Sequence, residues 1–122
     1  MRTVTDHKLN GLNEALEITV LDEPGAGGAC HVYAVTNPTQ LGHREFTRIE
    51  FHNGPIKEAG VNGISGEALM AIQIDRLRSF QAGPYACREN ALALTALEES
   101  LMWLQKRTRD RLARGVEGTS AK

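Results

Sequence analysis

The sequence predicts an α+β fold in which a small antiparallel β-sheet of about three strands precedes a long antiparallel helical hairpin. Between residues 14 and 53, apolar and polar residues alternate in short segments, with the period of half-buried strands. Between residues 64 and 114 the period becomes helical, and Gly83-Pro84 interrupts it. The length of 122 residues favours a single domain, 1–122, whose modest core is of the size that oligomerisation commonly supplements.

The expected strands follow one another along the chain. They are EALEITVLD at residues 14–22, CHVYAVT at 30–36 and FTRIEFH at 46–52. The loop EPGAGG and a loop that begins at Asn37-Pro38 separate them, and Asn53-Gly54-Pro55 ends the sheet region, 14–53. Such an order most simply forms an antiparallel meander, and we expect the polar residues 1–13 to be loose.

Two helices make up the expected hairpin, 64–114. After the turn GVNG, Ser65 is a suitable N-cap for a helix that runs from about residue 66 to 80. Pro84 suits the first turn of a second helix, from about 85 to 114, which would be about 45 Å long. The first helix is about half that length, so we expect the C-terminal half of the second to need the sheet or another subunit. Residues 115–122 are expected to form a flexible tail.

A helical wheel divides the apolar residues of the second helix into two groups, which together cover about 200°. The first includes Leu94, Leu97, Leu101 and Leu104, and the second consists of Leu92, Ala96 and Trp103. This arc is wider than the stripe of a helix that is buried on one side. The pattern therefore predicts two packing surfaces, one for the first helix and one for a second subunit.

Five cations lie between Lys106 and Arg114, against one acid, Asp110. The wheel places Lys106 on the polar face, but it places Arg107 and Arg111 inside the apolar arc, one turn apart. Two like charges on a partly buried face are unfavourable unless an anion lies between them, and the planar guanidinium suits phosphate oxygens.

The arginine pair is also compatible with three simpler roles. The cations could favour the helix dipole, their side chains could extend to solvent, or they could pair with Glu50 or Asp75 across an interface.

Composition excludes several classes of function. The net charge of −1 gives no basic field for duplex nucleic acid or a membrane surface, and no apolar run is long enough to span a bilayer. The N-terminal MRTVTDHKLN lacks an apolar region and there are two cysteines, so we expect a cytosolic protein with reduced thiols. The four histidines (His7, His31, His43 and His52) lack metal-ligand spacing, and no nucleophile–base signature is present. Neither a metal, a cofactor nor an enzyme is expected.

Two further residues are candidates for ligand contacts. Phe80, at the end of the first helix, could stack on a nucleobase, although an aromatic at such a position is more commonly part of the core. Asn90 begins the apolar stripe of the second helix, where its amide needs a partner, either loop backbone or the polar edge of a ligand.

Several distinctive sequence motifs occur between residues 54 and 119: GVNG, IDRLRSFQ, CRENALALTALEE, LMWLQKRT and RGVEGT. This stretch resembles the phage anti-Thoeris sponge family, the first described Thoeris anti-defence proteins, and GGACHVYAV is similar to the sheet region of that family. A similar hairpin occurs in a phage anti-CBASS sponge.

The resemblance implies a non-catalytic protein that acts in the cytoplasm of the infected bacterial host. It would bind glycocyclic ADP-ribose, the signal made by bacterial immune TIR enzymes, so that the effector is not activated. Some members also bind the cyclic di- or trinucleotides of CBASS at a separate site. The resemblance further implies a homodimer or homohexamer.

The resemblance implies ligand-binding residues at the positions where the motifs of this chain match those of the family. Phe80 would stack on the adenine, Asn90 would hydrogen-bond the base or ribose, and Arg107 and Arg111 would hold the pyrophosphate. Arg88, beside the turn between the helices, is a candidate for the second nucleotide site.

Two alternative functions remain. A hydrolase of such nucleotides would need a general base near the phosphates, for which Glu50, Glu89 and His31 are candidates. A structural or interaction protein would use the basic helix end to meet an acidic protein or nucleic acid, and its binding would depend steeply on salt.

Overall fold

A computed structural model describes residues 1–38 and 44–122. The chain separates into two compact units. The first contains residues 1–54 and 59–64, and the second contains residues 55–58 and 65–122.

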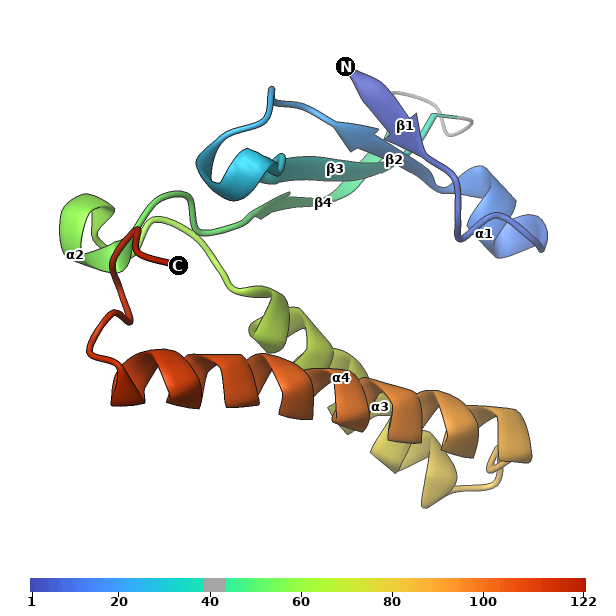
Figure 1. Ribbon diagram of the computed structural model, residues 1–122. Coiled ribbons are helices and arrows are strands. Elements are labelled where there is room, and N and C mark those ends of the chain that lie inside the picture. Colours follow the sequence, from blue (N-terminus) through green and yellow to red (C-terminus); the bar gives the residue numbers. More distant parts are fainter. Residues whose placement is uncertain (39–43) are drawn as a thin grey trace. The chain divides into compact units, whose positions relative to one another are not determined.

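The first unit contains a four-stranded antiparallel sheet with the order β1-β2-β3-β4, a meander (Figure 1). Its strands are β1 (Arg2–Val4), β2 (Glu17–Val20), β3 (Val32–Asn37) and β4 (Arg44–Glu50). Val20 and Ala34 are buried between the neighbouring strands and loops. The predicted α+β class and the meander are confirmed, with one strand more than the three that alternation indicates.

The additional strand lies in residues 1–13, where the prediction of a loose segment was wrong. Strand β1 pairs with β2 through the register Arg2↔Val20 to Val4↔Ile18. Helix α1 (Gly11–Ala15) follows, and Asn10 caps it by accepting a 3.1 Å hydrogen bond from the backbone N–H of Asn13. A three-residue strand is too short to display an alternating pattern, so pairing with β2 defines it instead.

The β2–β3 connection is organised by Asp22 and includes a short 3₁₀ turn, η1 (Ala26–Gly28). The Asp22 carboxylate accepts hydrogen bonds from the backbone N–H of His31 at 2.9 Å and of Val32 at 3.0 Å. Burial acts to raise the pKa of Asp22, but these backbone hydrogen bonds and the charge of His31 outweigh it, so the pKa lies below the usual 3.8. The ionised carboxylate therefore stabilises this connection.

After the predicted GVNG turn, the chain pairs with the backbone at the end of β4. Ile64 donates its backbone N–H to Glu50 O at 2.9 Å and accepts from the N–H of His52 at 2.8 Å. The Asn62 side chain binds the N–H and the carbonyl oxygen of Asn53, both at 2.8 Å. A Cβ on Gly63 would lie 2.5 Å from the backbone carbonyl carbon of Phe51, the residue after β4, so only glycine permits the approach.

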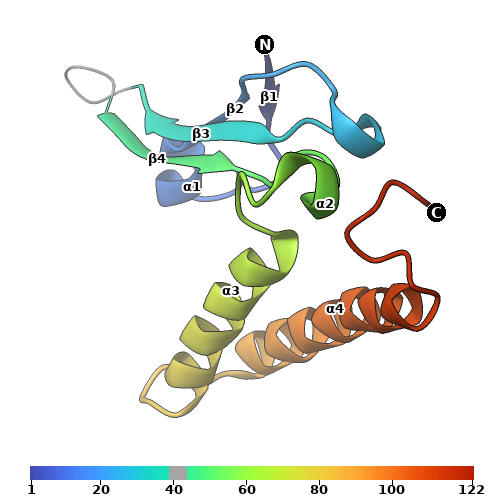
Figure 2. The same cartoon turned by 90° about the vertical axis from the view of Figure 1, so that its left-hand side faces the viewer.

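The second unit contains most of α2 (Ile56–Ala59), which the sequence did not predict, and the hairpin of α3 (Gly66–Gln81) and α4 (Arg88–Ala113). The predicted N-cap is confirmed, since Ser65 Oγ accepts the N–H of Ala68 at 3.0 Å. In Figure 2 the two helices meet at the turn that joins them and diverge from it.

Helix α4 begins at Arg88, and the expectation that Pro84 occupies its first turn was wrong. The Gln81 side chain binds both the N–H and the carbonyl oxygen of Cys87, each at 3.1 Å. Cys87 is held in an extended conformation, and its Sγ accepts the N–H of Asn90 as the N-cap. These side-chain contacts keep residues 82–87 out of the helix.

The hairpin leaves the C-terminal part of α4 beyond the reach of α3. With 16 and 26 residues, the helices are about 24 Å and 39 Å long. Ile74 is buried between them, whereas Leu92 is 52% exposed and Trp103 is 57% exposed. The second apolar group of α4 is therefore uncovered in this unit. No helix of the described residues is long and apolar enough to cross a membrane.

Candidate functional site

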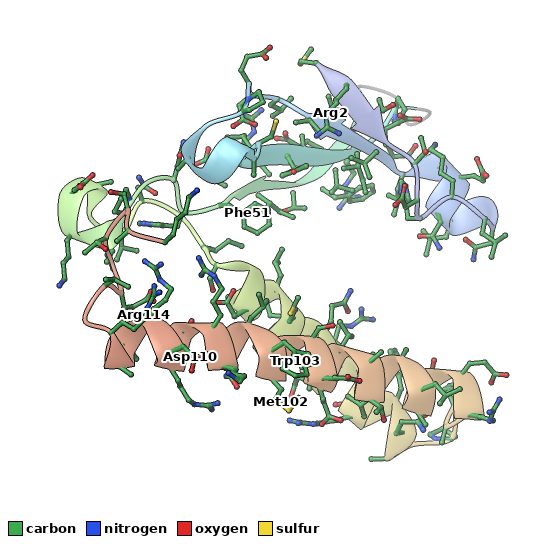
Figure 3. The ribbon with its side chains drawn as sticks, viewed as in Figure 1. Arg2, Phe51, Met102, Trp103, Asp110 and Arg114 are labelled. Atoms are coloured by element: carbon green, nitrogen blue, oxygen red, sulfur yellow. The ribbon has the colours of Figure 1, made fainter. Side chains whose placement is uncertain are left out.

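An open cavity of about 900 Å³ lies along the overhanging end of α4. Arg107 and Arg111, the arginine pair that the sequence singled out, both line this cavity. Figure 3 shows Trp103, Asp110 and Arg114, which also line the cavity, spaced along this part of the helix. The lining is basic because Lys106 and Lys122 complete it.

Arg111 is 8% exposed and is the one charged side chain buried among the described residues. Its Nε donates to Glu117 Oε2 at 3.1 Å, and Nη1 donates to Ala121 O at 2.6 Å. Its Nη2 donates to Val116 O at 2.9 Å and to Thr119 O at 3.0 Å. Arg111 thus uses four of the five N–H groups of its guanidinium on its own chain.

The C-terminal segment, residues 115–122, turns back from the end of α4 (Figure 2). Arg111 binds its carbonyl oxygens, and the carbonyl oxygen of Gly118 accepts a 3.0 Å hydrogen bond from the N–H of Lys57 in α2. Gly118 has a φ of +81°, and a Cβ there would lie 2.6 Å from Ile56 Cγ2. The tail that the sequence predicts to be flexible is therefore connected to both α4 and α2.

The cations of the cavity differ in their partners. Lys106 pairs with Asp110 at 2.8 Å on the exposed side of α4. Arg107 is exposed and has no hydrogen bond or ion pair to any of the residues that the structure describes. Arg114 donates one hydrogen bond within the described ranges, from Nη2 to the backbone oxygen of Lys122. The positive charge that has no carboxylate partner among the described residues therefore comes from Arg107, Arg114 and the side chain of Lys122.

The other predicted ligand residues lie at the opposite end of the hairpin. Phe80, in the last turn of α3, is 40% exposed, and the guanidinium of Arg76 lies over its ring at 5.4 Å from the centroid. Asn90, in the first turn of α4, is partly buried, and its side-chain amide has no hydrogen-bond partner in the described ranges. Arg88 is exposed beside it, at the first position of the helix.

One chain does not bring all four predicted ligand residues together. Asn90 and Arg107 are seventeen residues apart on one helix, which is about 25 Å along its axis. The structure therefore groups Phe80 with Asn90 at the turn, and Arg107 with Arg111 in the cavity.

The family model for "Acb2/Tad1, hairpin domain" matches residues 44–109, more than half of the chain. The chain belongs to the Acb2/Tad1 hairpin family. The Acb2/Tad1 match includes Phe80, Asn90 and Arg107 and ends before Arg111.

A curated relative, Thoeris anti-defense 1 of Bacillus phage SBSphiJ7, is 54% identical over 74 residues. The alignment covers 61% of this chain and 52% of that protein, so this Acb2/Tad1 hairpin chain spans about half the length of the relative. The two comparisons confirm the family resemblance seen in the sequence.

None of the candidates for other chemistry is among the residues that line the cavity. His31 contacts Ala26 O through Nε2 at 3.0 Å, and Glu50 is an exposed residue of the sheet. Glu89 lies in the first turn of α4, about 27 Å along the helix from Arg107. Within residues 1–38 and 44–122, no group of three His, Cys, Asp or Glu side chains could hold a metal ion, and His43 lies outside these ranges.

Two residues of the site were missed by sequence reasoning. Within this chain, the carboxylate that pairs with Arg111 is Glu117 of the tail. Nothing in the helical pattern could identify Glu117, because it lies beyond the end of the helix. Arg114 was identifiable, since the wheel places it beside Trp103 and Arg107.

Proposed function

We propose that this chain is a phage anti-defence protein that binds and sequesters glycocyclic ADP-ribose, a bacterial immune signalling nucleotide, without cleaving it. The observation that carries the proposal is the basic cavity at the end of α4, where Arg107 is exposed and unpaired among the described residues. A pyrophosphate supplies the anion that such a site lacks, and arginine binds phosphate oxygens with strong, charge-assisted hydrogen bonds. Membership in the Acb2/Tad1 hairpin family supports the same function.

In this proposal, Arg107 and Arg111 hold the pyrophosphate. Phe80 stacks on the adenine through the ring surface that remains exposed, and the unpaired amide of Asn90 binds the base or the ribose. The residues hold the molecule and do not react with it, so the captured signal no longer reaches its effector in the host cytoplasm.

Because the two halves of the site lie about 25 Å apart on one chain, we propose that a second copy completes it. Leu92, Ala96 and Trp103 form an exposed apolar stripe on α4 that suits an antiparallel pairing with the same stripe of another copy. If Leu92 lies opposite the partner's Trp103, the turn of each hairpin meets the basic end of the other α4. Two equivalent sites result in a dimer, and hexamers could be built from such dimers.

A second nucleotide site is proposed at the hairpin turn for cyclic di- or trinucleotides. Arg88 is its candidate residue, because it is exposed and has no hydrogen bond or ion pair within the described part of the chain. An Arg88→Ala variant would lose this second ligand and retain glycocyclic ADP-ribose.

The test of the function is binding followed by recovery. The full chain is mixed with glycocyclic ADP-ribose, the affinity is measured by calorimetry, and the ligand is recovered after the protein is denatured. We expect micromolar or tighter binding and chemically unchanged ligand by chromatography and mass spectrometry. Absence of binding would refute the proposal, and altered ligand would show a hydrolase instead.

The arginines are tested in the same assay. Arg107→Ala removes charge-assisted hydrogen bonds, each worth about 1.5–3 kcal/mol, so we expect a loss of affinity of at least about tenfold. Arg109→Ala is the matched control, because Arg109 lies on the same helix and does not line the cavity. Equal binding by both variants would contradict the assignment of the pocket.

A further inference from the structure

We infer that Arg114 is a further phosphate-binding residue, which forms an anion clamp with Arg107 at the end of α4. The inference rests on the proposed function, since the anion is the pyrophosphate of the sequestered nucleotide. The cavity, the helical geometry and the partners of each cation carry it.

The helix places Arg107 and Arg114 on the same face. Arg114 still has helical backbone angles, φ −84° and ψ −5°, as the C-cap of α4. Seven residues make nearly two helical turns, so the two side chains start about 20° apart around the axis and about 10 Å apart along it. Flexible arginine side chains from such positions can converge on a single pyrophosphate between them, and both line the same cavity.

The partners of the cations leave these two arginines for the ligand, together with the more flexible side chain of Lys122, which lacks the planar fork of arginine. Lys106 is paired with Asp110, which turns both groups into a neutral pair on the cavity edge. Arg114 uses one N–H group, on a backbone oxygen, and Arg107 uses none on the described residues. A pyrophosphate diester has one negative charge on each phosphate, and two guanidinium groups that have no carboxylate side chain as partner among the described residues balance these charges.

Arg111 cannot replace Arg114 while the tail keeps its present position. Its four hydrogen bonds to the tail leave a single N–H group, so it cannot bind a phosphate with two parallel hydrogen bonds. In this arrangement Arg111 contributes one hydrogen bond and holds the tail, while Arg107 and Arg114 provide the paired contacts.

The test compares the affinity of the full chain for glycocyclic ADP-ribose in four variants: Arg107→Ala, Arg114→Ala, Arg114→Lys and Arg109→Ala. Calorimetry is performed at low and high salt, and circular dichroism with thermal melting checks the fold. We expect Arg114→Ala to weaken binding about ten- to a hundredfold and to reduce its salt dependence, as Arg107→Ala does. Arg114→Lys should recover part of the affinity, because lysine retains the charge without the planar fork. Arg109→Ala should bind like the parent.

The outcomes separate the inference from the function on which it rests. If Arg114→Ala binds within about twofold of the parent while Arg107→Ala is weak, the inference is wrong and the proposed function stands. If the parent does not bind, the proposed function fails, and the inference fails with it. Should Arg114→Ala not fold, Arg114→Lys carries the test, and an affinity of Arg114→Lys equal to that of the parent would overturn the clamp.

Discussion

Replacing Arg111 with alanine should release the C-terminal segment from the hairpin without unfolding the chain. Four hydrogen bonds would be lost, one of them to the carboxylate of Glu117. Each is worth about 1 kcal/mol net, but Glu117 and Ala121 are partly or largely exposed, so water replaces part of the loss. The expected cost is about 2–3 kcal/mol, and it falls on the tail and not on the helices, since alanine is itself a strong helix former.

Amide hydrogen exchange measures this cost where it arises. The N–H of Val116 donates to the backbone oxygen of Arg111 at the end of α4, that of Thr119 donates to Val116 O within the segment, and that of Lys57 donates to Gly118 O. A local loss of 2–3 kcal/mol should accelerate the exchange of these amides by about 30- to 150-fold. The exchange of the amides in the middle of α4 should change little.

Arg107→Ala is the matched control, because it makes the same substitution one turn earlier at a residue with no partner among those described. We expect the tail amides of this variant to exchange within about twofold of the parent. Unchanged exchange in Arg111→Ala, or equal acceleration in both variants, would refute the role of Arg111 in holding the tail.

Three further predictions concern the sheet unit. Gly63→Ala should lower the free energy of unfolding by about 2–3 kcal/mol in a denaturant titration, because its Cβ would lie 2.5 Å from a backbone atom of Phe51. Gly66→Ala is the control, because nothing lies within 4 Å of its Cβ, and it should be neutral or slightly stabilising. Equal effects of the two substitutions would contradict this steric cause. Asn62→Ala should cost about 1–2 kcal/mol in the same titration, since two hydrogen bonds to Asn53 are lost, and an unchanged midpoint would disprove their contribution. The pKa of Asp22 is lowered on folding, so its contribution to stability is complete above the usual value of 3.8 and is lost as the pH falls through the lower folded pKa. The melting temperature of the parent should therefore fall more steeply below pH 4 than that of Asp22→Asn. Parallel curves of melting temperature against pH would refute the linkage.

The sequence was sufficient to predict those features of the fold that depend on a local residue pattern. Ser65 was identified as the N-cap of α3 because a serine before a helical period has a specific partner, the N–H of Ala68. The sheet meander and the overhang of α4 followed in the same way from alternation and from helix length. The match to the family model covers α3 and most of α4, and it identifies no single contact.

What the sequence did not reveal depends on contacts between distant residues. Strand β1 exists through its pairing with β2, and α4 begins at Arg88 because Gln81 binds the backbone of Cys87. The site shows the same limit. Helical spacing placed Arg107 and Arg111 together, but it could not distinguish the arginine that binds the tail from the one that stays free.

The proposal that two copies complete the site leads to a complementation experiment. Phe80→Ala and Arg107→Ala remove opposite halves of the site, so each variant alone should bind glycocyclic ADP-ribose poorly. In a mixed antiparallel dimer, one site combines both substitutions and the other combines the intact Phe80 of one copy with the intact Arg107 of its partner. If the two variants are unfolded together and refolded in equal amounts, half of the dimers are mixed, and about one quarter of all sites should regain the affinity of the parent.

The stoichiometry measured by calorimetry decides the result, because restored sites retain the affinity of the parent while their number is reduced. Phe80→Ala refolded with Arg109→Ala is the control for the recovery of active sites after refolding, since Arg109 lies outside the cavity and the number of intact sites should depend on Phe80 alone, whether or not the copies mix. Each dimer of that mixture has one intact site for every copy with an unchanged Phe80, which is about half of all sites. No recovery in the Phe80→Ala and Arg107→Ala mixture, with dimers confirmed by native mass spectrometry, would show that each site uses residues of a single copy. The 25 Å between Asn90 and Arg107 would then require a different pair of ligand residues, and the cavity with Arg107 and Arg114 would have to bind the nucleotide without Phe80.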